Sequence, residues 1–342
     1  MLDLPFVTFD WVAAWWQCLR SDRFMVRDEL FFVVFRDQAG SLRGVAPLML
    51  TSRPARGPLR MRQLQCVGAD TNLTELRCVA AHRSDLDAIH LALIDYLRGL
   101  QLPLDWIKFT GIGSSAVLEH ITRKFGVPRW SRAIPDFVIT LKATWEEFRG
   151  GLPRNIKESL RKCYNAPRRD GVEFEFVRVS QTGELQAAIP DVLRLHAARS
   201  ELAGTVDHPN VFRSEASQRF LREVCRRFAL RDRLRIYQLR RDGVVVATRV
   251  GFVCNDSLYL FYSGYDPAYA RYSVMTRVVA EAIQDAIASG LKTVNLSVGR
   301  DISKERWHPQ ELTYHEIDVT APCHWSRMMY QLYRIASVCL RK

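Results

Sequence analysis

The chain has 342 residues, of which 48% are hydrophobic and 25% are charged, as in ordinary folded proteins. This composition excludes a disordered or collagen-like chain, and the length allows one large domain or two. Forty-one arginines and eight lysines stand against 37 acidic residues and give a net charge of +12. That charge indicates either a phosphorylated or nucleic-acid partner or the codon usage of a GC-rich genome.

Other classes of protein are disfavoured by what the sequence lacks. No run of about 18 charge-free apolar residues is present, so we do not expect an integral membrane protein. Asp3 and Asp10 stand where a secretory signal would be basic, and we expect a cytoplasmic location. The eight cysteines form no C-x-x-C pair, and the eight histidines have no zinc-ligand spacing. We therefore expect buried free thiols and no metal.

The first part of the chain predicts a helix, a hairpin and a strand–helix–strand unit. An aromatic helix is expected over Phe9–Leu19, followed by hairpin strands Leu30–Phe35 and Gly44–Leu50. A helix over Ser84–Arg98 then leads to a strand over Asp105–Thr110.

A glycine-containing turn over residues 111–116 follows that strand and opens a helix, so it imitates a dinucleotide-binding fingerprint. It lacks the preceding βαβ context, and a strand-end turn is the alternative. Periodicity lapses over Pro128–Pro135, which we take as a domain boundary. A strand over Asp136–Leu141 comes next. The helix Arg154–Arg169 is strongly basic on one side, which fits a solvated face or a contact to tRNA, lipid phosphate or glycan phosphate.

The second half repeats the pattern of the first. Strands over Leu234–Arg240 and Val244–Cys254 flank Asp242-Gly243, a strong hairpin signal, and a third strand covers Ser257–Ser263. A helix over Ser273–Ser289 is stopped by a glycine and leads to a strand over Thr293–Leu296. A repeat near 200 residues is too long for a solenoid. It predicts two α/β domains in tandem.

The connection between the third strand and the helix is a candidate ligand site. In such a crossover a ligand lies at the carboxyl end of the strand that feeds the helix, with its phosphates at the helix N-terminus. The connection supplies Gly264, Arg271 and the N-cap Ser273, which suit a pyrophosphate. A plain surface loop covered by tyrosines is the alternative.

The meander, the loop SGYDPAYARYS, the following helix and the run VNLSVGRDISKERW together resemble the GNAT acyltransferases. More narrowly, they resemble the FemAB-related, CelD-like group associated with cellulose and envelope polysaccharide synthesis, whose members fuse two GNAT-like domains. The resemblance covers nearly the whole chain and is strongest over Pro135–Val319. It implies a cytoplasmic transferase with two mixed, mainly antiparallel sheets flanked by helices.

The resemblance assigns cofactor and substrate residues by position. The family's cofactor loop matches a continuous segment of six residues that would bind acyl-CoA. They are Arg271, Tyr272, Ser273, Val274, Met275 and Thr276. The family usually has Pro-Gly where Val274-Met275 stands, and Asn295 replaces an aspartate. Because a glycine lets the backbone approach pyrophosphate, Met275 leaves open a different acyl donor or a drifted site.

The same resemblance points to substrate-binding and catalytic residues. His196, Arg199 and Trp307 would bind substrate. Four tyrosines are candidates for the acid that protonates the leaving group, and Tyr265 is our choice. Lys304 would stabilise negative charge, and Asp301 would bind a substrate amine or orient Lys304.

Two further basic stretches have open interpretations. Residues 219–241 carry nine arginines and fit the same alternatives as the basic helix. The C-terminal stretch 324–342 is apolar and basic, which favours a packed terminal helix over a membrane-surface anchor.

Together with these patterns, the resemblance implies residues 1–130 as a degenerate N-terminal GNAT-like domain, 131–320 as the acyltransferase domain and 321–342 as a C-terminal helix. The predicted function is acyl transfer from acyl-CoA to an amine or hydroxyl of a sugar or cell-envelope precursor. An aminoacyl-tRNA-dependent FemAB-type transferase and a non-catalytic binding protein are the alternatives. tRNA and a peripheral membrane contact stay open as partners.

Overall fold

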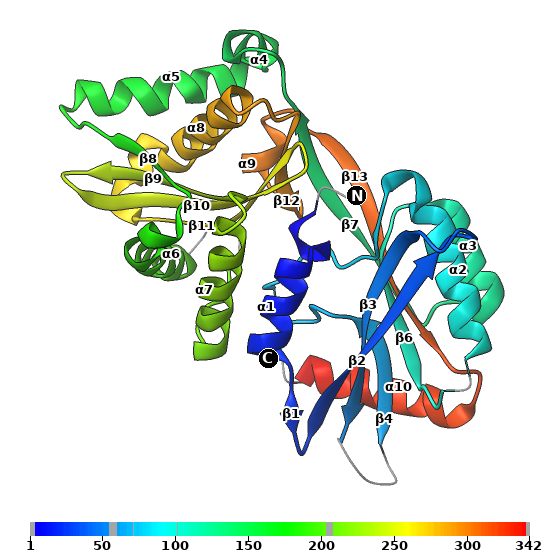
Figure 1. The fold of residues 1–342 in the computed structure, drawn as a ribbon. Helices are drawn as coiled ribbons and strands as arrows, with labels where there is room; N and C mark the ends of the chain where they lie inside the picture. Colours follow the sequence, from blue (N-terminus) through cyan, green and yellow to red (C-terminus); the bar gives the residue numbers. More distant parts are fainter. Residues whose placement is uncertain (1–3, 55–59, 71, 101, 203–207, 340–342) are drawn as a thin grey trace. The chain divides into compact units, whose positions relative to one another are not determined.

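The computed structural model describes residues 4–54, 60–70, 72–100, 102–202 and 208–339 (Figure 1). The chain forms two compact units. Unit 1 consists mainly of Phe6–Ile134 and Thr313–Lys342, and unit 2 mainly of Pro135–Leu312. Within the described ranges, no helix is both long enough and apolar enough to cross a bilayer.

The sheet of unit 1 has the order β1-β2-β3-β4-β6-β13, with β5 paired to β3. β2, β3 and β4 form an antiparallel meander, and β6 then lies parallel to β4. The last strand, β13, pairs antiparallel with β6. The strands are β1 (Asp22–Arg23), β2 (Val26–Arg36), β3 (Leu42–Arg53), β4 (Met61–Cys66), β5 (Ala80–Ala81), β6 (Trp106–Ile112) and β13 (Gln310–Thr320).

Helices cover both faces of this sheet. Trp106 of β6 packs against Tyr330 and Tyr333 of α10, whereas Ile107, which points to the other face, packs near Leu97 of α2. The helices are α1 (Phe9–Leu19), α2 (Leu86–Gly99), α3 (Ser115–Phe125) and α10 (His324–Cys339), with 3-10 turns at Pro5–Val7 and Arg83–Asp85. Gly111, the first residue of the glycine-containing segment 111–116, lies within β6 and is packed against the chain, because a Cβ there would lie 2.6 Å from the Arg77 carbonyl oxygen.

The sheet of unit 2 has the order β7-β12-β11-β10-β9-β8. Each of the strands β8 to β10 pairs antiparallel with the next strand along the chain, and β12 lies parallel to β11. β7 closes this part of the sheet by pairing antiparallel with β12. The strands are β7 (Trp130–Thr140), β8 (Glu175–Val179), β9 (Leu234–Arg241), β10 (Val244–Cys254), β11 (Ser257–Tyr265) and β12 (Thr293–Val298).

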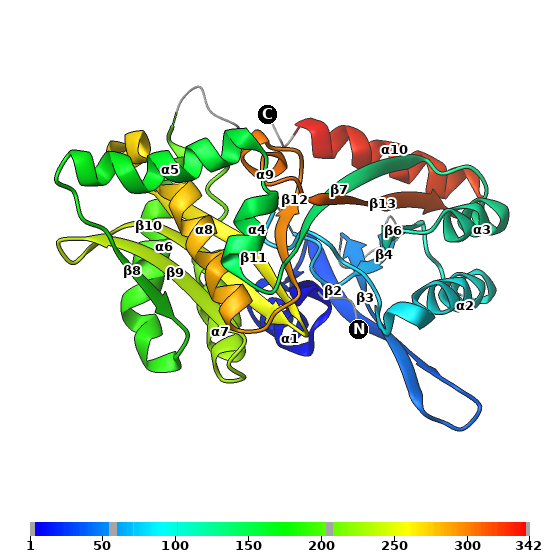
Figure 2. The same cartoon turned by 90° about the horizontal axis from the view of Figure 1, so that it is seen from above.

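The helices of unit 2 lie in two layers, which Figure 2 shows from a second direction. On one face, Tyr237 of β9 belongs to a core shared with α5 and α8. On the other face, Phe228 of α7 packs against Phe252 of β10, and α6 contacts β11. The helices are α4 (Trp145–Gly151), α5 (Arg154–Arg169), α6 (Leu185–Ser200), α7 (Glu215–Ala229), α8 (Val274–Ala288) and α9 (Ile302–Glu305), with 3-10 turns at Thr182–Glu184 and Pro267–Tyr272.

The two units repeat one topology. In each, three antiparallel strands lead through one helix to a parallel strand: β2-β3-β4, α2 and β6 in unit 1, and β9-β10-β11, α8 and β12 in unit 2. The predicted fold class, a tandem of mixed, mainly antiparallel sheets flanked by helices, is confirmed. The closing strand of unit 1, β13, comes from the C-terminal part of the chain, and that of unit 2, β7, precedes the unit's own meander.

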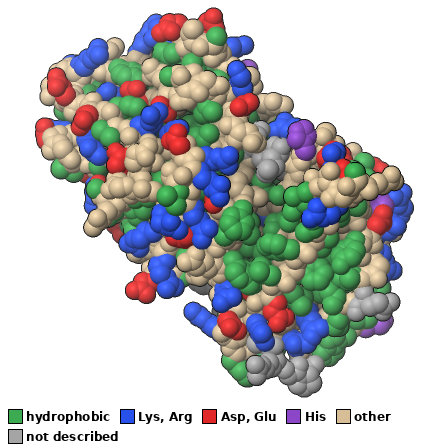
Figure 3. Space-filling model, viewed as in Figure 1, with side chains coloured by type: hydrophobic (Ala, Val, Ile, Leu, Met, Phe, Trp, Pro, Cys, Tyr) green, Lys and Arg blue, Asp and Glu red, His purple; other side chains and the backbone are tan. Residues whose placement is uncertain are grey.

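The surface of the chain carries both charge and apolar side chains. Figure 3 shows Lys and Arg interspersed with Asp and Glu, together with a region dominated by hydrophobic side chains. Leu30, Phe32 and Val34 alternate along β2, and each is about half exposed. In the view of Figure 3, the Lys and Arg side chains are spread over the surface rather than gathered in one patch.

Candidate active site

The central feature of unit 2 is a gap between two parallel strands. β11 and β12 pair only over Ser257–Tyr259 and Thr293–Asn295, although β11 continues to Tyr265 and β12 to Val298. Two local features part the strands. Ser297 of β12 has a left-handed φ of 72°, and two residues of β11 lie opposite Val250 of β10 in a β-bulge. The two strands therefore leave a gap between them ahead of α8.

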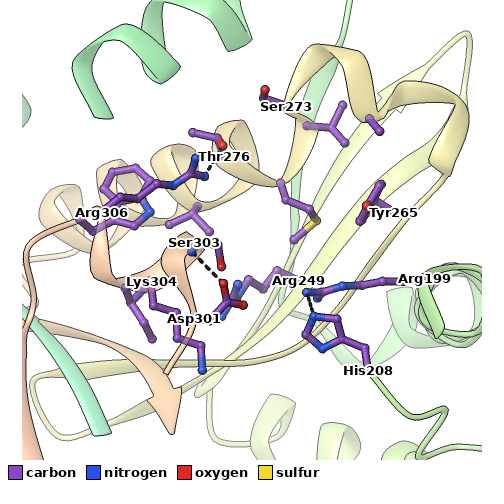
Figure 4. A pocket seen from close by; sticks show the side chains of 16 residues that line it. Arg199, His208, Arg249, Tyr265, Ser273, Thr276, Asp301, Ser303, Lys304 and Arg306 are labelled. Carbon is purple, nitrogen blue, oxygen red and sulfur yellow. Dashed lines mark hydrogen bonds between the residues drawn. The ribbon is translucent and has the colours of Figure 1, made fainter. Parts of the chain in front are cut away.

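A pocket of about 300 Å³ occupies this gap and reaches the N-terminus of α8. It is lined by strand, helix and loop residues that are far apart in the sequence (Figure 4). They are Arg199, His208, Arg249, Tyr265, Ala270, Ser273, Val274, Met275, Thr276, Val279, Leu296, Asp301, Ser303, Lys304, Arg306 and Trp307.

The pocket is strongly cationic. Arg199, Arg249, Lys304 and Arg306 line it, whereas Asp301 is the one carboxylate among its described lining residues. Figure 4 shows Arg199 with His208 at one end and Arg306 with Thr276 at the other, with Asp301 between them. Such a surplus of positive charge favours a ligand that carries phosphate or carboxylate groups.

The segment after β12 holds Lys304 in a fixed position. Its Nζ donates to Ser297 Oγ at 3.0 Å and to the backbone oxygens of Val298 at 2.5 Å and Gly299 at 3.3 Å. These partners tie the ammonium to the end of the strand that parts from β11. The cation is therefore pre-positioned at the edge of the gap.

Asp301 caps the short helix α9 and remains ionised. Its Oδ1 accepts a hydrogen bond from the Ser303 backbone N–H at 2.8 Å. Burial opposes ionisation, but the hydrogen bonds from Ser303 and the charge of Lys304 outweigh it and lower the pKa of Asp301. A carboxylate with a lowered pKa accepts hydrogen bonds well and takes up protons poorly.

The position that the resembling family fills with an aspartate is occupied by Asn295, which bonds to the carboxyl of Asp136. Asn295 Nδ2 donates to Asp136 Oδ2 at 2.8 Å, and both side chains are buried. Burial raises the pKa of Asp136 to about 6, while the Asn295 hydrogen bond and the charge of Lys304 act in the opposite direction. Neither residue lines the pocket.

At the other end of the pocket, α6 presents basic side chains to β11. Arg199 donates to Ser263 Oγ, and its second nitrogen donates to His208 Nε2 at 2.5 Å. Burial and the neighbouring Arg199 charge lower the pKa of His208 to about 4. His208 is therefore a neutral hydrogen-bond acceptor near pH 7. His196, in contrast, donates through Nδ1 to the Ser263 backbone oxygen, packs on Phe212 and does not line the pocket.

The predicted cofactor loop divides into two parts. Ser273 to Thr276 line the pocket, and Arg306 donates to Thr276 Oγ1 at 2.5 Å. Ser273 has a left-handed φ of 53°, and its side chain makes no cap hydrogen bond to α8. Arg271 and Tyr272 are not among the lining residues: Arg271 stacks on the Tyr272 ring and lies 3.9 Å from Asp170.

Of the other predicted residues, Tyr265, Asp301, Lys304, Arg199 and Trp307 all line the pocket. Three lining residues with ionisable or cationic side chains were not anticipated.

Those three are Arg249, Arg306 and His208. An arginine inside the apolar run of β10 was a usable signal for Arg249, whose guanidinium donates to the Leu260 backbone oxygen at 3.3 Å. Arg306 lies within the motif VNLSVGRDISKERW, in which the resemblance assigns roles only to other residues. No local pattern marks His208, which reaches the pocket through tertiary structure.

The lowered pKa of His208 predicts a pH dependence of stability. The unfolded chain binds a proton near pH 6.5, whereas the folded chain binds it only near pH 4. Between these values the unfolded state holds more protons, so the free energy of unfolding should fall as the pH decreases from 6.5 to 4. Urea unfolding of wild type and His208→Gln across this range checks it: the variant should lose less stability. Equal losses in the two proteins would contradict the assignment.

Comparisons with known proteins agree with the topology. Residues 154–307 match the sequence family described as Acetyltransferase (GNAT) domain. No curated protein matches the chain. The chain is similar in structure to FemX, with a TM-score of 0.63 and 8% identity, over 96% of this chain and 94% of FemX.

Two further solved structures are similar at lower scores. A conserved protein of unknown function from Bacteroides thetaiotaomicron has a TM-score of 0.50 at 12% identity, over 93% of this chain and 92% of that one. L-PGS from Bacillus licheniformis has a TM-score of 0.47 at 11% identity, with 96% of each chain covered. At these identities, the likeness to FemX and to the Bacteroides protein shows the fold alone.

Proposed function

We propose that the protein is a GNAT-type acyltransferase that moves an acyl group from acyl-CoA to an amine or hydroxyl of a sugar or cell-envelope precursor. One observation carries the proposal: parallel strands β11 and β12 part after three residue pairs, directly beside the N-terminus of α8. The match of residues 154–307 to the GNAT domain family supports the same reaction class.

The donor would lie along the gap with its phosphates toward α8. The first N–H groups of a helix have no partner within the helix, and its dipole favours anions. Ser273 and Thr276 line this end of the pocket, and Arg306 adds a cation beside Thr276. The pyrophosphate of acyl-CoA would therefore meet both backbone donors and a guanidinium.

The steps of acyl transfer follow from where the charged and polar groups lie around the gap. The acceptor nitrogen or oxygen attacks the thioester carbonyl carbon, and the carbonyl oxygen becomes an oxyanion. Backbone N–H groups of β11 and the fixed Lys304 ammonium would stabilise that charge. When the carbon–sulfur bond breaks, Tyr265 would donate its proton to the leaving sulfur, and the proton that the acceptor nitrogen or oxygen loses would return to Tyr265. Asp301 would orient the acceptor by accepting a hydrogen bond from it.

The acceptor end of the pocket suits a polar, anionic molecule. Arg199 and Arg249 line it, whereas Trp307 is buried in the core of unit 2 and presents little of its ring to a ligand. An envelope or polysaccharide precursor offers hydroxyl or amine nucleophiles and phosphate or carboxylate groups in one molecule. This combination supports the proposed acceptor class.

Arg306→Ala should weaken acyl-CoA binding, and thermal denaturation tests this. Acyl-CoA at about 100 times its Kd should stabilise the wild-type protein by about 2.7 kcal/mol and raise its Tm by several degrees. Arg306→Ala should lose most of that rise. Arg300→Ala is the matched control, because Arg300 is exposed, pairs with Glu311 and does not line the pocket. An unchanged Tm of the wild-type protein across a panel of acyl-CoAs would contradict acyl-CoA as the donor.

An aminoacyl-tRNA donor is the second candidate. The Met275 side chain lines the pocket at the position where the resembling family has glycine, so the backbone there is less open to a pyrophosphate. An aminoacyl-tRNA has an ester in place of the thioester and needs no pyrophosphate site. Stabilisation by aminoacyl-tRNA without stabilisation by acyl-CoA would favour this candidate. Stabilisation by neither would favour a non-catalytic binding protein.

A further inference from the structure

A second cavity lies in unit 2, between α4, α5 and α8, and we call it the α5 groove. Its volume is about 690 Å³, and it shares no lining residue with the pocket at the strand gap. In Figures 1 and 2, α5 crosses α8, and α4 lies near both. The groove is lined by Trp145, Glu146, Arg149, Gly150, Lys157, Leu160, Arg161, Tyr164, Asn165, Arg168, Glu281 and Gln284.

The sequence of α5 builds one wall of the groove. Four residues at helical spacing are buried, namely Ile156, Leu160, Cys163 and Pro167, and the first three belong to the core shared with α8. The cations Lys157, Arg161 and Arg168 follow the adjacent row of the helix and line the groove. At 1.5 Å per residue, the row spans about 16 Å, which is longer than a single phosphate.

The cations of the groove are available for a ligand. The guanidinium groups of Arg149, Arg161 and Arg168 make no hydrogen bond or ion pair with any described residue, and all three side chains are exposed. Lys157 Nζ donates to the Gly150 backbone oxygen at 2.7 Å, which ties α5 to the end of α4 and keeps its charge at the groove.

The acidic residues of the groove do not cancel this charge. Glu281 lies 3.5 Å from Arg277 and accepts a hydrogen bond from the Tyr164 hydroxyl at 3.1 Å, so it is already paired. Glu146 lies in the first turn of α4, where the helix dipole stabilises a carboxylate. The groove therefore presents four cations against one unpaired carboxylate.

Two aromatic rings accompany the cations. Trp145 and Tyr164 are half-buried and line the groove. Guanidinium groups next to aromatic rings match the two parts of a nucleotide, because phosphates bind to arginine and bases stack on rings. The volume lies within the range of small-molecule sites.

The surroundings of the groove lack the apolar side chains that a lipid needs. Among the described residues, the exposed large hydrophobic side chains lie elsewhere, and none belongs to α4 or α5. A helix that binds a membrane surface needs apolar side chains to insert beside its cations. The groove has the cations without them.

We propose that the α5 groove binds nucleotides, with phosphates on Arg149, Arg161 and Arg168 and a base against Trp145 or Tyr164. The ligand is either a free nucleoside diphosphate or the single-stranded part of an RNA, which share this chemistry. The proposal does not depend on the acyl transfer proposed above, since the groove and the pocket are lined by different residues.

The test is fluorescence anisotropy with a fluorescein-labelled single-stranded RNA of about twelve nucleotides, competed by ADP or by unlabelled RNA. Arg161→Glu/Arg168→Glu should weaken RNA binding at least about tenfold. Losing two phosphate contacts should also reduce the salt slope of the affinity by about 1.4. If ADP displaces the labelled RNA at concentrations near the Kd of ADP for the protein, the ligand is a free nucleotide. If unlabelled RNA displaces the labelled RNA and ADP does not, the ligand is an RNA.

Two controls separate the groove from net charge and from the acyl-CoA site. Arg219→Glu/Arg222→Glu changes two exposed arginines of α7 and has the same net charge as the groove variant. It should keep its affinity within about threefold, and Arg306→Ala should do the same. Equal weakening of both double variants, loss of binding only in Arg306→Ala, or no binding of RNA and ADP to the wild-type protein would overturn the proposal. Binding to phosphatidylglycerol vesicles without binding to RNA or ADP would also overturn it.

Discussion

Replacing Lys304 with methionine is expected to lower the rate of acyl transfer by about 10²- to 10³-fold, the size of effect seen when one group that stabilises a developing oxyanion is removed. The Lys304 ammonium is fixed by Ser297 Oγ and by the backbone oxygens of Val298 and Gly299 at the edge of the gap. The loss should fall on kcat, because the charge acts mainly on the transition state. Steady-state kinetics with an accepted acyl donor measures it.

A structural effect of the substitution must be separated from a catalytic one. Methionine leaves two backbone oxygens without this donor, which can cost about 1–3 kcal/mol of stability where they are buried. Lys304→Arg keeps a cation and hydrogen-bond donors at the same place and should recover part of the rate. A Lys304→Met protein that folds normally and turns over within about threefold of wild type would contradict the proposed role.

Gly264→Ala is expected to destabilise unit 2 by about 3 kcal/mol, at the upper end of overpacking effects. A Cβ at this position of β11 would lie 2.3 Å from the Leu195 backbone carbon and 2.4 Å from the His196 nitrogen. Because these atoms belong to the backbone of α6, the helix itself would have to move. Urea unfolding of the wild-type and variant proteins measures the change.

The close approach at Gly264 also positions the pocket. Arg199, on the same helix, bonds to Ser263 Oγ, so a displaced α6 would carry this guanidinium away from the pocket. Gly183→Ala is the matched control, since nothing lies within 4 Å of its Cβ position and Gly183 is exposed. It should change the free energy of unfolding by less than about 1 kcal/mol. Similar losses in both variants would contradict the packing argument.

Local signals in the sequence predict much of unit 2. The Asp242-Gly243 turn and the alternating runs around it give β9 and β10, and the glycine after α8 ends that helix at Ala288. The expected helix over 273–289 is observed as Val274–Ala288. Turn and cap preferences are local, so a single sequence contains them.

The pairing of strands could not be predicted from these local signals. The sequence predicts one hairpin in the N-terminal repeat, whereas β4 (Met61–Cys66) adds a third antiparallel strand. The C-terminal strand β13 pairs with β6, more than 200 residues earlier in the chain. Neither pairing leaves a pattern in the residues themselves, because strand partners are chosen by tertiary packing.

The pocket was predicted where a motif is continuous and missed where it is assembled in space. Ser273–Thr276 and Asp301–Lys304 each lie in one short segment, and residues of both line the pocket. The connection between β11 and α8, predicted as a ligand site or a plain surface loop, contains the 3-10 turn Pro267–Tyr272, which leaves Arg271 stacked on Tyr272 and exposed. Arg249 and His208 reach the pocket from a strand and from a separate loop.

The central claim is that an acyl donor binds between β11 and β12. A crystal structure with a thioether analogue of acyl-CoA, which cannot transfer its acyl group, tests this most directly. The account predicts electron density for the acyl carbonyl between Tyr265 and Leu296, with the diphosphate at Ser273–Thr276. Density for the analogue at any other place, with β11 and β12 enclosing only solvent, would contradict it.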